Sequence, residues 1–187
     1  NPLWLVASSW GEIRINATIA SYMKGYSDPR SAVYFTTSKL GGDSPYMGMR
    51  SGLEGVKPAT YSGYSMPNYE QKDDMLMFCA AETAFLRAEG ALRGWDMGGS
   101  ARDFYEQGVK LSFDQRKVSG ADEYLANAVA VPEPFVDPVN PAKCNYTPKT
   151  KITIAWNEGA STEEKLERII TQKWIANFPL GFEGWAD

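Results

Sequence analysis

Residues 73–117 carry the clearest structural pattern in this chain, two amphipathic helices separated by a short glycine-rich turn. In the first helix, small or apolar residues recur three or four positions apart and form one continuous stripe. The stripe consists of Met77, Ala81, Ala84, Ala88, Ala91 and Trp95. We expect this helix to begin at Asp73 and Asp74, which suit the positive end of the helix dipole, and to end at Gly94.

The second helix is predicted to run from Ser100 to about Lys117. Ser100 is a favourable N-cap, and Asp103 three positions later completes a capping box. The inward positions are Ala101, Phe104, Tyr105, Gly108, Val109, Leu111 and Ser112. Small residues on the facing stripes let the helices approach closely, so the pair forms an αα-hairpin like those of tetratricopeptide repeats. The predicted fold class is therefore mainly α, with helix hairpins, long loops and a few short strands.

Shorter patterns flank this hairpin. Apolar positions at helical spacing predict a helix over residues 12–24, which Gly25 ends. The β-branched and aromatic runs at 33–37 and 152–156 are each predicted to be a strand. A short helix is expected at 122–127.

The last long helix is predicted to begin at Ser161, with Glu164 at the capping-box position. Its expected buried residues are Leu166, Ile169, Ile170 and Trp174. The helix should end near Pro179, because proline cannot continue it. Phe182 and Trp185 are expected to begin a further segment.

Residues 38–72 and 118–150 show no helical or alternating periodicity and are predicted to be long loops. Loops of this length in a compact domain are usually either functional or disordered. The first loop is rich in tyrosine, which argues for an ordered, packed segment. Its tyrosines are Tyr46, Tyr61, Tyr64 and Tyr69.

The composition excludes several classes of function. The net charge is −4 and no basic cluster is continuous, so no nucleic-acid partner is expected. The chain contains no histidine, the commonest general base and zinc ligand, and we predict no metal, no cofactor and no catalytic residue. Cys79 lies in an apolar run and is interpreted as a buried free thiol. No apolar run approaches the roughly 20 residues that span a bilayer.

The ends of the sequence suggest an internal piece of a longer polypeptide. Residues 1–4 contain no initiator Met and no signal-peptide pattern, and the last residues show no helix-terminating signal. We therefore expect any targeting sequence to lie outside these 187 residues.

Three strings in this order resemble the C-terminal half of SusD/RagB-family proteins. They are Gly25-Tyr26-Ser27-Asp28-Pro29-Arg30, the helix and turn at 80–99 with Gly94-Trp95 and Gly98-Gly99, and residues 169–187 ending in Glu183-Gly184-Trp185-Ala186-Asp187. The opening Asn1-Pro2-Leu3-Trp4 resembles a segment that precedes the first string in one branch of the family. The resemblance covers nearly the whole chain except the two long loops, so residues 1–187 are expected to form one partial domain.

The resemblance implies a fold, a location and a function. Members have a mainly α-helical, tetratricopeptide-like scaffold whose long loops carry the ligand site. They are lipid-anchored at the outer membrane of Gram-negative bacteria and face the cell exterior. Each covers a SusC-like, TonB-dependent barrel and hands it captured glycans or, in the RagB branch, peptides. The resemblance therefore implies a nutrient-binding protein that is not an enzyme, with its lipid anchor outside this sequence.

Charged motif residues on the helices are interpreted as structural. Glu82, Arg87 and Glu89 lie on an otherwise apolar helix and are expected to form interhelical ion pairs. Glu82 and Glu89 share a face and resemble a glycosidase acid pair, but they would lie roughly 10 Å apart on a packed helix. Arg30 is expected to bind carbonyls or a carboxylate within its own turn, and Gly98-Gly99 is interpreted as a turn.

The candidate ligand contacts lie in the first long loop and just before the first helix. Sugar capture needs flat aromatic faces with a few polar groups, whereas peptide capture needs a groove lined by polar groups. The candidates are Trp10, Asp43, Tyr46, Arg50, Tyr61 and Tyr64. The leading hypothesis is glycan binding; the alternatives are oligopeptide binding, a generic tetratricopeptide-type interaction scaffold and, least favoured, a hydrolase.

Overall fold

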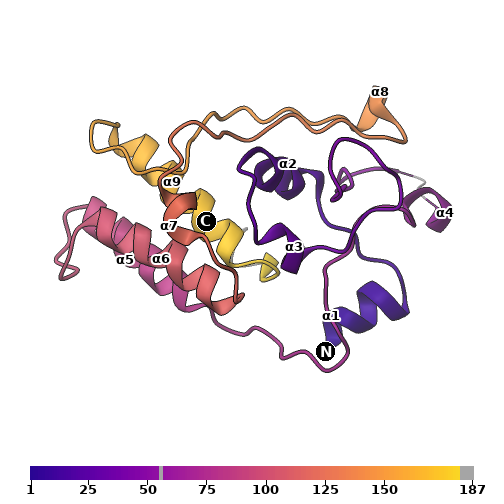
Figure 1. Cartoon of the computed structure of the whole chain (residues 1–187), viewed down its shortest axis with the longest axis horizontal. Coiled ribbons are helices and arrows are strands. Elements are labelled where there is room, and N and C mark those ends of the chain that lie inside the picture. The colour runs from indigo at the N-terminus through magenta and orange to yellow at the C-terminus, as the bar shows by residue number, and fades with distance from the viewer. Residues whose placement is uncertain (55–56, 182–187) are drawn as a thin grey trace. The chain divides into compact units, whose positions relative to one another are not determined.

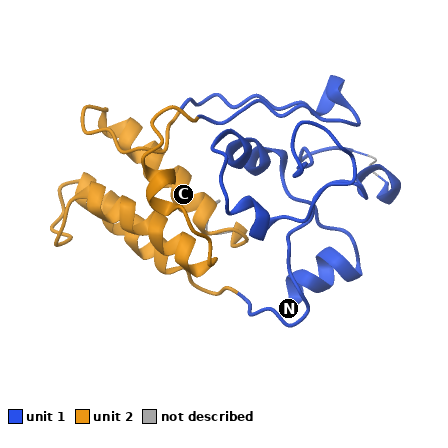
Figure 2. Ribbon diagram, in the orientation of Figure 1, with its two compact units in different colours: residues 1–75, 131–151 blue, residues 76–130, 152–187 orange. Residues whose placement is uncertain are grey.

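The chain is organised as two units, each of which combines segments far apart in the sequence (Figure 2). The computed structural model describes residues 1–54 and 57–181. Unit 1 consists of Asn1–Met75 and Val131–Lys151, and unit 2 consists of Leu76–Ala130 and Ile152–Asp187. The predicted segment at Phe182 and Trp185, and with it the end of the third family-like string, lies outside the described residues.

Unit 1 has short helices and long irregular connections (Figure 1). Its helices are α1 (Pro2–Trp4), the π-type turn η1 (Leu5–Ser9), α2 (Ala17–Gly25), α3 (Ser31–Tyr34), α4 (Pro58–Tyr61) and α8 (Pro141–Cys144). The loop at 38–72 is ordered and packed as expected, because Met47 and Tyr64 belong to a buried cluster with Ala17 and Phe135.

The first predicted helix starts five residues too early, since α2 begins at Ala17 and not at Glu12. The backbone just before α2 forms hydrogen bonds with the long loop instead. The Ile15 N–H donates to the Ser65 carbonyl (3.0 Å), and the Met49 N–H donates to the Ile15 carbonyl (2.8 Å). The side chain of Asn16 then accepts from the N–H of Thr18 (2.6 Å), which fixes the helix start.

The predicted strand at 33–37 is wrong, because Ser31–Tyr34 form the short helix α3. The turn before it dictates this conformation. Asp28 and Arg30 form a bidentate ion pair (2.9 and 2.6 Å) with both side chains 0% exposed, so the carboxylate is the partner that Arg30 binds of the two kinds expected in this turn. The Asp28 carbonyl also accepts from the N–H of Ser31 (3.1 Å), so the chain continues as a helical turn.

Unit 2 is built on the predicted helix hairpin. Its helices are α5 (Ala80–Leu92), α6 (Ala101–Gln115), α7 (Ala121–Leu125) and α9 (Thr162–Ala176), with α5 packed against both α6 and α9 (Figure 1). The small residue at Gly108 is required, because a Cβ there would lie 2.7 Å from the ring of Phe85. The capping boxes at Ser100–Asp103 and Ser161–Glu164 are both present. The fold class is mainly α, as predicted.

Helix α5 begins at Ala80, seven residues later than expected from Asp73. The side chain of Asn1 binds the segment where the helix was expected to begin. The Asn1 amide donates to the carbonyls of Asp73 and Asp74, each at 3.2 Å. Met77 and Trp95, the two ends of the predicted stripe, lie outside Ala80–Leu92 and are exposed.

The predicted strand at 152–156 is also wrong. In the described residues, strand-like pairing occurs only as three isolated bridges, Asn16–Met49, Phe35–Pro67 and Phe135–Tyr146. Residues 152–156 instead run irregularly over α6, where the buried Tyr105 hydroxyl donates to the Ile154 carbonyl (2.6 Å). Of the four residues expected to be buried in α9, Ile169 is fully buried and the others are half-buried.

The charged residues of α5 are structural but do not form the predicted interhelical ion pairs. Glu82 accepts from the side chain of Asn177 (3.0 Å), which lies just after α9. Arg87 donates to the Met97 carbonyl (2.7 Å) and lies over the ring of Phe104 (3.9 Å). Glu89 pairs with Arg93 one turn along its own helix. Amide, carbonyl and ring partners for Glu82 and Arg87, and a partner on the same helix for Glu89, thus replace the expected interhelical ion pairs.

Candidate functional site

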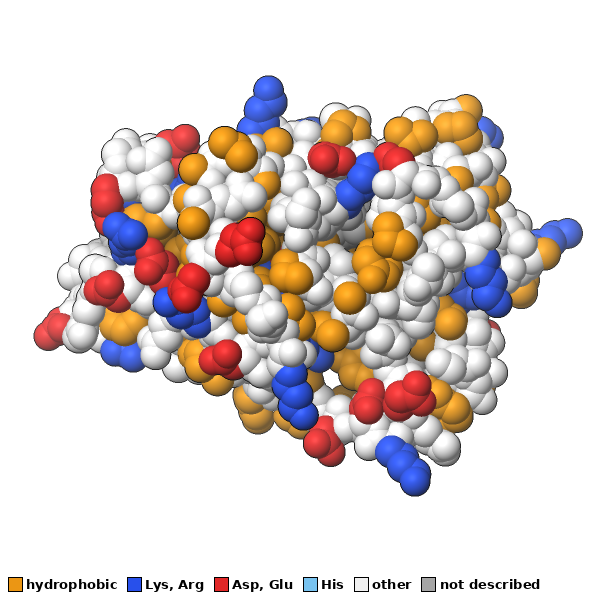
Figure 3. Space-filling view, in the orientation of Figure 1, with side chains coloured by type: hydrophobic (Ala, Val, Ile, Leu, Met, Phe, Trp, Pro, Cys, Tyr) orange, Lys and Arg blue, Asp and Glu red, His pale blue; other side chains and the backbone are white. Residues whose placement is uncertain are grey.

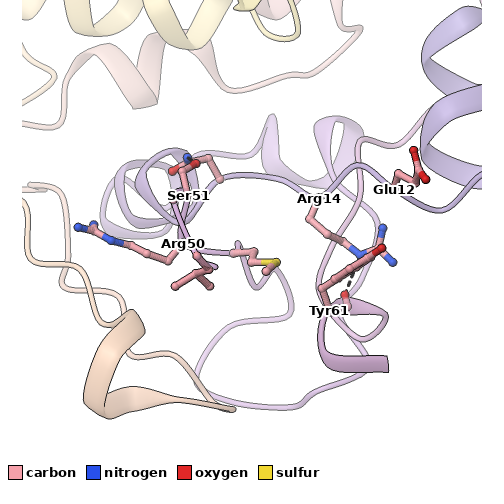
Figure 4. A pocket seen from close by; sticks show the side chains of 9 residues that line it. Glu12, Arg14, Arg50, Ser51 and Tyr61 are labelled. Carbon is pink, nitrogen blue, oxygen red and sulfur yellow. Dashed lines mark hydrogen bonds between the residues drawn. The ribbon is translucent and has the colours of Figure 1, made fainter. Parts of the chain in front are cut away.

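Unit 1 contains an open pocket of about 340 Å³, which we call the groove. Its lining residues are Glu12, Arg14, Asn16, Met49, Arg50, Ser51, Gly52, Leu53 and Tyr61. They come from the extended segment before α2, the middle of the long loop and the end of α4. Figure 4 shows Glu12, Arg14 and Tyr61 on one side of the groove and Arg50 and Ser51 on the other.

Arg14 and Tyr61 form one side of the groove (Figure 4). The Arg14 guanidinium lies 5.1 Å from the centre of the Tyr61 ring, and its Nε donates to the Tyr61 carbonyl (2.8 Å). Its Nη1 donates to the carbonyls of Gly11 (3.0 Å) and Ile13 (2.7 Å). Burial lowers the pKa of Arg14, which Tyr61 partly offsets. These contacts hold the half-buried Tyr61 ring in place.

The opposite side presents polar groups. The Asn16 amide donates to the Ser51 hydroxyl (2.5 Å), and both side chains line the groove. Arg50 lies over the ring of Tyr146, 5.2 Å from its centre. Met49 and Leu53 add apolar surface to the lining. The groove therefore offers an aromatic ring, apolar surface and several hydrogen-bonding groups, a combination that suits ligands with apolar faces and polar edges.

The six predicted ligand residues do not gather at one place. Arg50 and Tyr61 line the groove. Trp10 is 62% exposed and lies two residues before Glu12 in the sequence. Asp43 forms an ion pair with Lys24 (2.5 Å), and Tyr46 is half-buried with its ring edge-on to Phe35.

Tyr64, the last of the six, lies in the core of unit 1 and is only 5% exposed. Its hydroxyl lies 2.8 Å from both carboxylate oxygens of Asp137, which is itself buried. Burial and the Asp137 carboxylate both raise the pKa of the Tyr64 hydroxyl well above its usual range. This contact, which we call the Tyr64–Asp137 tie, joins the long loop to residues 131–151.

Replacing Tyr64 by Phe is expected to lower the free energy of unfolding by about 1–3 kcal/mol, because it removes the hydroxyl donor from a buried carboxylate. The raised pKa means that the folded protein holds this proton more tightly than the unfolded chain. The contribution is thus complete below about pH 10 and declines as the pH rises above that value. Denaturant unfolding of both proteins at pH 7 and pH 11 measures the effect. Tyr46→Phe is the control. An equal loss of unfolding free energy in Tyr64→Phe and Tyr46→Phe would contradict a stabilising role for the Tyr64–Asp137 tie.

Arg14, Asn16 and Ser51 were not among the sequence candidates. The first two fall in residues 12–24, which were predicted to be one helix, so their side chains were not expected to line a loop-built pocket. Asn16 did carry a usable signal, because asparagine is a favoured N-cap and the following residues are helical. Ser51 lies in a stretch without periodicity, where its pairing with Asn16 depends on a contact 35 positions away.

Unit 2 carries a second open pocket, of about 380 Å³. Six mostly polar residues of α6 line it: Asp103, Glu106, Gln107, Lys110, Leu111 and Asp114. On the face drawn in Figure 3, acidic and basic side chains are interspersed.

Within residues 1–54 and 57–181, no group of three or more His, Cys, Asp or Glu side chains is arranged to hold a metal ion. No helix in this part of the chain is both long and apolar enough to cross a bilayer.

Comparisons with known proteins place these features in a family. A family model described as SusD-like, SusD and RagB outer membrane lipoprotein, matches residues 1–187. A chitin-binding SusD homolog from Flavobacterium johnsoniae is 48% identical in sequence and superposes with a TM-score of 0.93. The match covers 100% of this chain and 39% of that protein. No curated protein matched the chain.

Two further solved structures are similar to this chain. A SusD homolog from Bacteroides uniformis is 50% identical, with a TM-score of 0.86, and the match covers 92% of this chain and 35% of that one. A SusD-like protein from Bacteroides thetaiotaomicron is 45% identical, with a TM-score of 0.86, over 98% of this chain and 39% of that one. The chain spans about two fifths of the length of these relatives. It belongs to the SusD-like family of outer membrane lipoproteins.

Proposed function

We propose that this chain is part of a cell-surface protein that captures a glycan and passes it to a SusC-like, TonB-dependent transporter of the outer membrane. The protein acts by binding, without chemistry on the ligand and without a cofactor. A lipid anchor holds it at the membrane, facing the cell exterior. The groove on unit 1 is the part of this chain that contacts the glycan.

The observation that carries the proposal is the match, over the whole of this chain, to a chitin-binding SusD homolog at 48% identity. The match covers 100% of this chain with a TM-score of 0.93. A chitin fragment, which is a neutral oligosaccharide with N-acetyl groups, is therefore the first ligand to test.

The chemistry of the groove is consistent with a sugar ligand. A pyranose ring has apolar C–H faces and polar hydroxyl edges. The Tyr61 ring, Met49 and Leu53 offer apolar contact, while Asn16, Ser51 and Arg50 offer donors and acceptors. A RagB-like oligopeptide ligand is the competing interpretation, since the family description covers both SusD and RagB.

A binding panel separates these ligands. The native polypeptide that contains this chain is titrated with chito-oligosaccharides, malto-oligosaccharides and a mixture of short peptides, and the recovered ligands are analysed by mass spectrometry. We expect at least one oligosaccharide to bind and to be recovered at its original length. Binding of peptides alone would move the protein to the RagB-like function, and shortened oligosaccharides would contradict the assignment as a binding protein.

Replacing Tyr61 by Ala is expected to weaken oligosaccharide binding by a factor of about 2 to 10, since loss of one aromatic contact is worth about 0.5–1.5 kcal/mol. Calorimetric titration of native and variant protein measures the change. The matched control is Trp95→Ala, which removes an exposed aromatic ring from unit 2. Equal affinities for Tyr61→Ala and the native protein would show that the glycan binds elsewhere.

A further inference from the structure

Asn16 is both the N-cap of helix α2 and a lining residue of the groove. Its side-chain oxygen Oδ1 accepts from the backbone N–H of Thr18 (2.6 Å), and its Nδ2 donates to the Ser51 hydroxyl (2.5 Å). The first contact decides the orientation of the amide, because a backbone N–H can bind only the oxygen of an amide. The Asn16 nitrogen therefore faces Ser51, and the Ser51 oxygen is the acceptor in this bond.

The backbone of the long loop brings Ser51 to Asn16. The Met49 N–H donates to the Ile15 carbonyl (2.8 Å), one residue before the N-cap. A Cβ on Gly48 would lie 2.5 Å from the Asn16 carbonyl oxygen, so the loop passes directly against the residue that caps α2. Ser51 follows Met49 by two positions, and the side-chain bond to Asn16 then fixes its hydroxyl.

The proton of the Ser51 hydroxyl is left for another partner. A serine hydroxyl has one O–H donor and two lone pairs, and the bond from Asn16 uses one lone pair. Among the described residues, this bond is the only hydrogen bond of the Ser51 side chain. The Ser51 O–H cannot point at Asn16, where an N–H group already lies. Ser51 is exposed and lines the groove (Figure 4), so its O–H can donate to solvent or to a ligand there.

We propose that Asn16 is a positioning residue that makes Ser51 a hydrogen-bond donor to the glycan. The proposal rests on the glycan-binding function proposed above. Asn16 donates a hydrogen bond to Ser51, and Ser51 donates one to an acceptor oxygen of the sugar. A hydroxyl that is already held by one partner loses less rotational freedom when the ligand binds. The side of the groove opposite Tyr61 thus selects an acceptor atom of the ligand.

Replacing Asn16 by Asp reverses this contact and keeps the N-cap. Aspartate caps a helix about as well as asparagine, so the denaturant midpoint should not fall. The introduced carboxylate has no proton to donate, so the Ser51 hydroxyl turns and donates to it. We expect oligosaccharide binding to weaken by a factor of about 2 to 10, the size of one hydrogen bond. Ser51→Ala should weaken binding by the same factor, since it removes the donor.

The double variant, Asn16→Asp with Ser51→Ala, tests whether residue 16 acts only through Ser51. The probe is a chito-oligosaccharide, which is neutral, or whichever oligosaccharide the panel identifies, titrated calorimetrically. The double variant should bind as Ser51→Ala does, because the hydroxyl through which Asn16 acts is absent. A further loss or a gain of affinity in the double variant would show that residue 16 acts on the ligand directly, which overturns the positioning role.

A second readout needs no ligand. A hydrogen bond from a hydroxyl to a carboxylate stabilises the charged form and lowers the pKa of the carboxyl group. The pKa of the carboxyl group introduced by Asn16→Asp, followed by NMR, should therefore be lower with the Ser51 hydroxyl present than in the double variant. Equal pKa values would show that residues 16 and 51 do not form this contact in solution, and the proposal would be overturned.

The result for Tyr61→Ala separates the donor role from the groove itself. If Ser51→Ala and Asn16→Asp bind like the native protein while Tyr61→Ala binds more weakly, the donor role is wrong and the groove stands. If Tyr61→Ala also binds like the native protein, the groove assignment fails as well. If the native protein binds no oligosaccharide, the proposed function itself fails, and the donor role with it.

Discussion

Replacing Asp28 by Ala is expected to lower the free energy of unfolding by about 3–5 kcal/mol. Asp28 and Arg30 are both completely buried, and the carboxylate binds the guanidinium at 2.9 and 2.6 Å. Removing the carboxylate takes a counter-charge and two short hydrogen bonds from a completely buried guanidinium. Breaking a buried ion pair by removing one partner costs more than the modest net stabilisation that the intact pair contributes, so the loss should be large.

The same substitution also removes a local turn contact, because Asp28 Oδ1 accepts from the backbone N–H of Arg30 (3.0 Å). Helix α3 follows directly, so amide exchange should accelerate in α2 and α3. The matched control is Asp43→Ala, which breaks an exposed ion pair with Lys24 in the same unit and should cost at most about 1 kcal/mol. Denaturant unfolding compares the two, and similar losses in both variants would show that burial of the Asp28 pair is not decisive.

Replacing Phe85 by Ala is expected to cost about 3–5 kcal/mol, through lost burial and the cavity that remains. Phe85 is fully buried in α5, with its ring near Tyr105 and directly against Gly108 of α6. The absence of a side chain at Gly108 is what allows this ring to lie between the helices. Neighbouring backbone cannot easily move in to refill the space, because α5 is also packed against α9.

Leu86→Ala is the control for this substitution. Leu86 is the next residue on α5 but is exposed, so its truncation should change stability by no more than about 0.5 kcal/mol. Amide exchange followed peptide by peptide should show faster exchange in α5 and α6 for Phe85→Ala. Unchanged exchange in α6 would argue against the Phe85–Gly108 contact as the main joint of the hairpin.

The parts of the fold that the sequence predicted correctly depend on local chemistry. Both capping boxes need only residues three positions apart, and Ser100 and Ser161 mark the starts of α6 and α9 as expected. Asp28 and Arg30 are only two positions apart, so the sequence could predict that Arg30 finds its partner within its own turn. The small-residue stripe predicted the close contact between α5 and α6, since Gly108 faces a large ring.

The predicted starts of α2 and α5 are wrong because a distant segment forms hydrogen bonds with the backbone that precedes each helix. The pattern before α2 is helical, but Ile15 binds Ser65 and Met49 of the long loop. The pattern before α5 is helical too, but the carbonyls of Asp73 and Asp74 bind Asn1. Helix propensity is a weak preference that such contacts override. Phe78, expected in the helix, lies outside it and is 87% exposed.

The candidate site was predicted only in part, for a related reason. The tyrosines of the first long loop predicted ligand contacts there, and the ring of Tyr61 does line the groove. The same reasoning selected Tyr64, which is buried and bound to Asp137, 73 positions away. Arg14 was overlooked because its carbonyl contacts require the segment to be extended and not helical. A pocket formed by three separate segments leaves no periodic signal in any one of them.

The central claim, that the groove on unit 1 captures a glycan, is tested most directly by mapping a bound oligosaccharide onto the chain. Amide hydrogen exchange of the native polypeptide is measured with and without a saturating chito-oligosaccharide, or another oligosaccharide that binds. The account predicts slower exchange in residues 11–16, in residues 49–53 and around Tyr61, with α6 of unit 2 unchanged. Protection confined to unit 2, or no protection in those three segments while the oligosaccharide is bound, would contradict it.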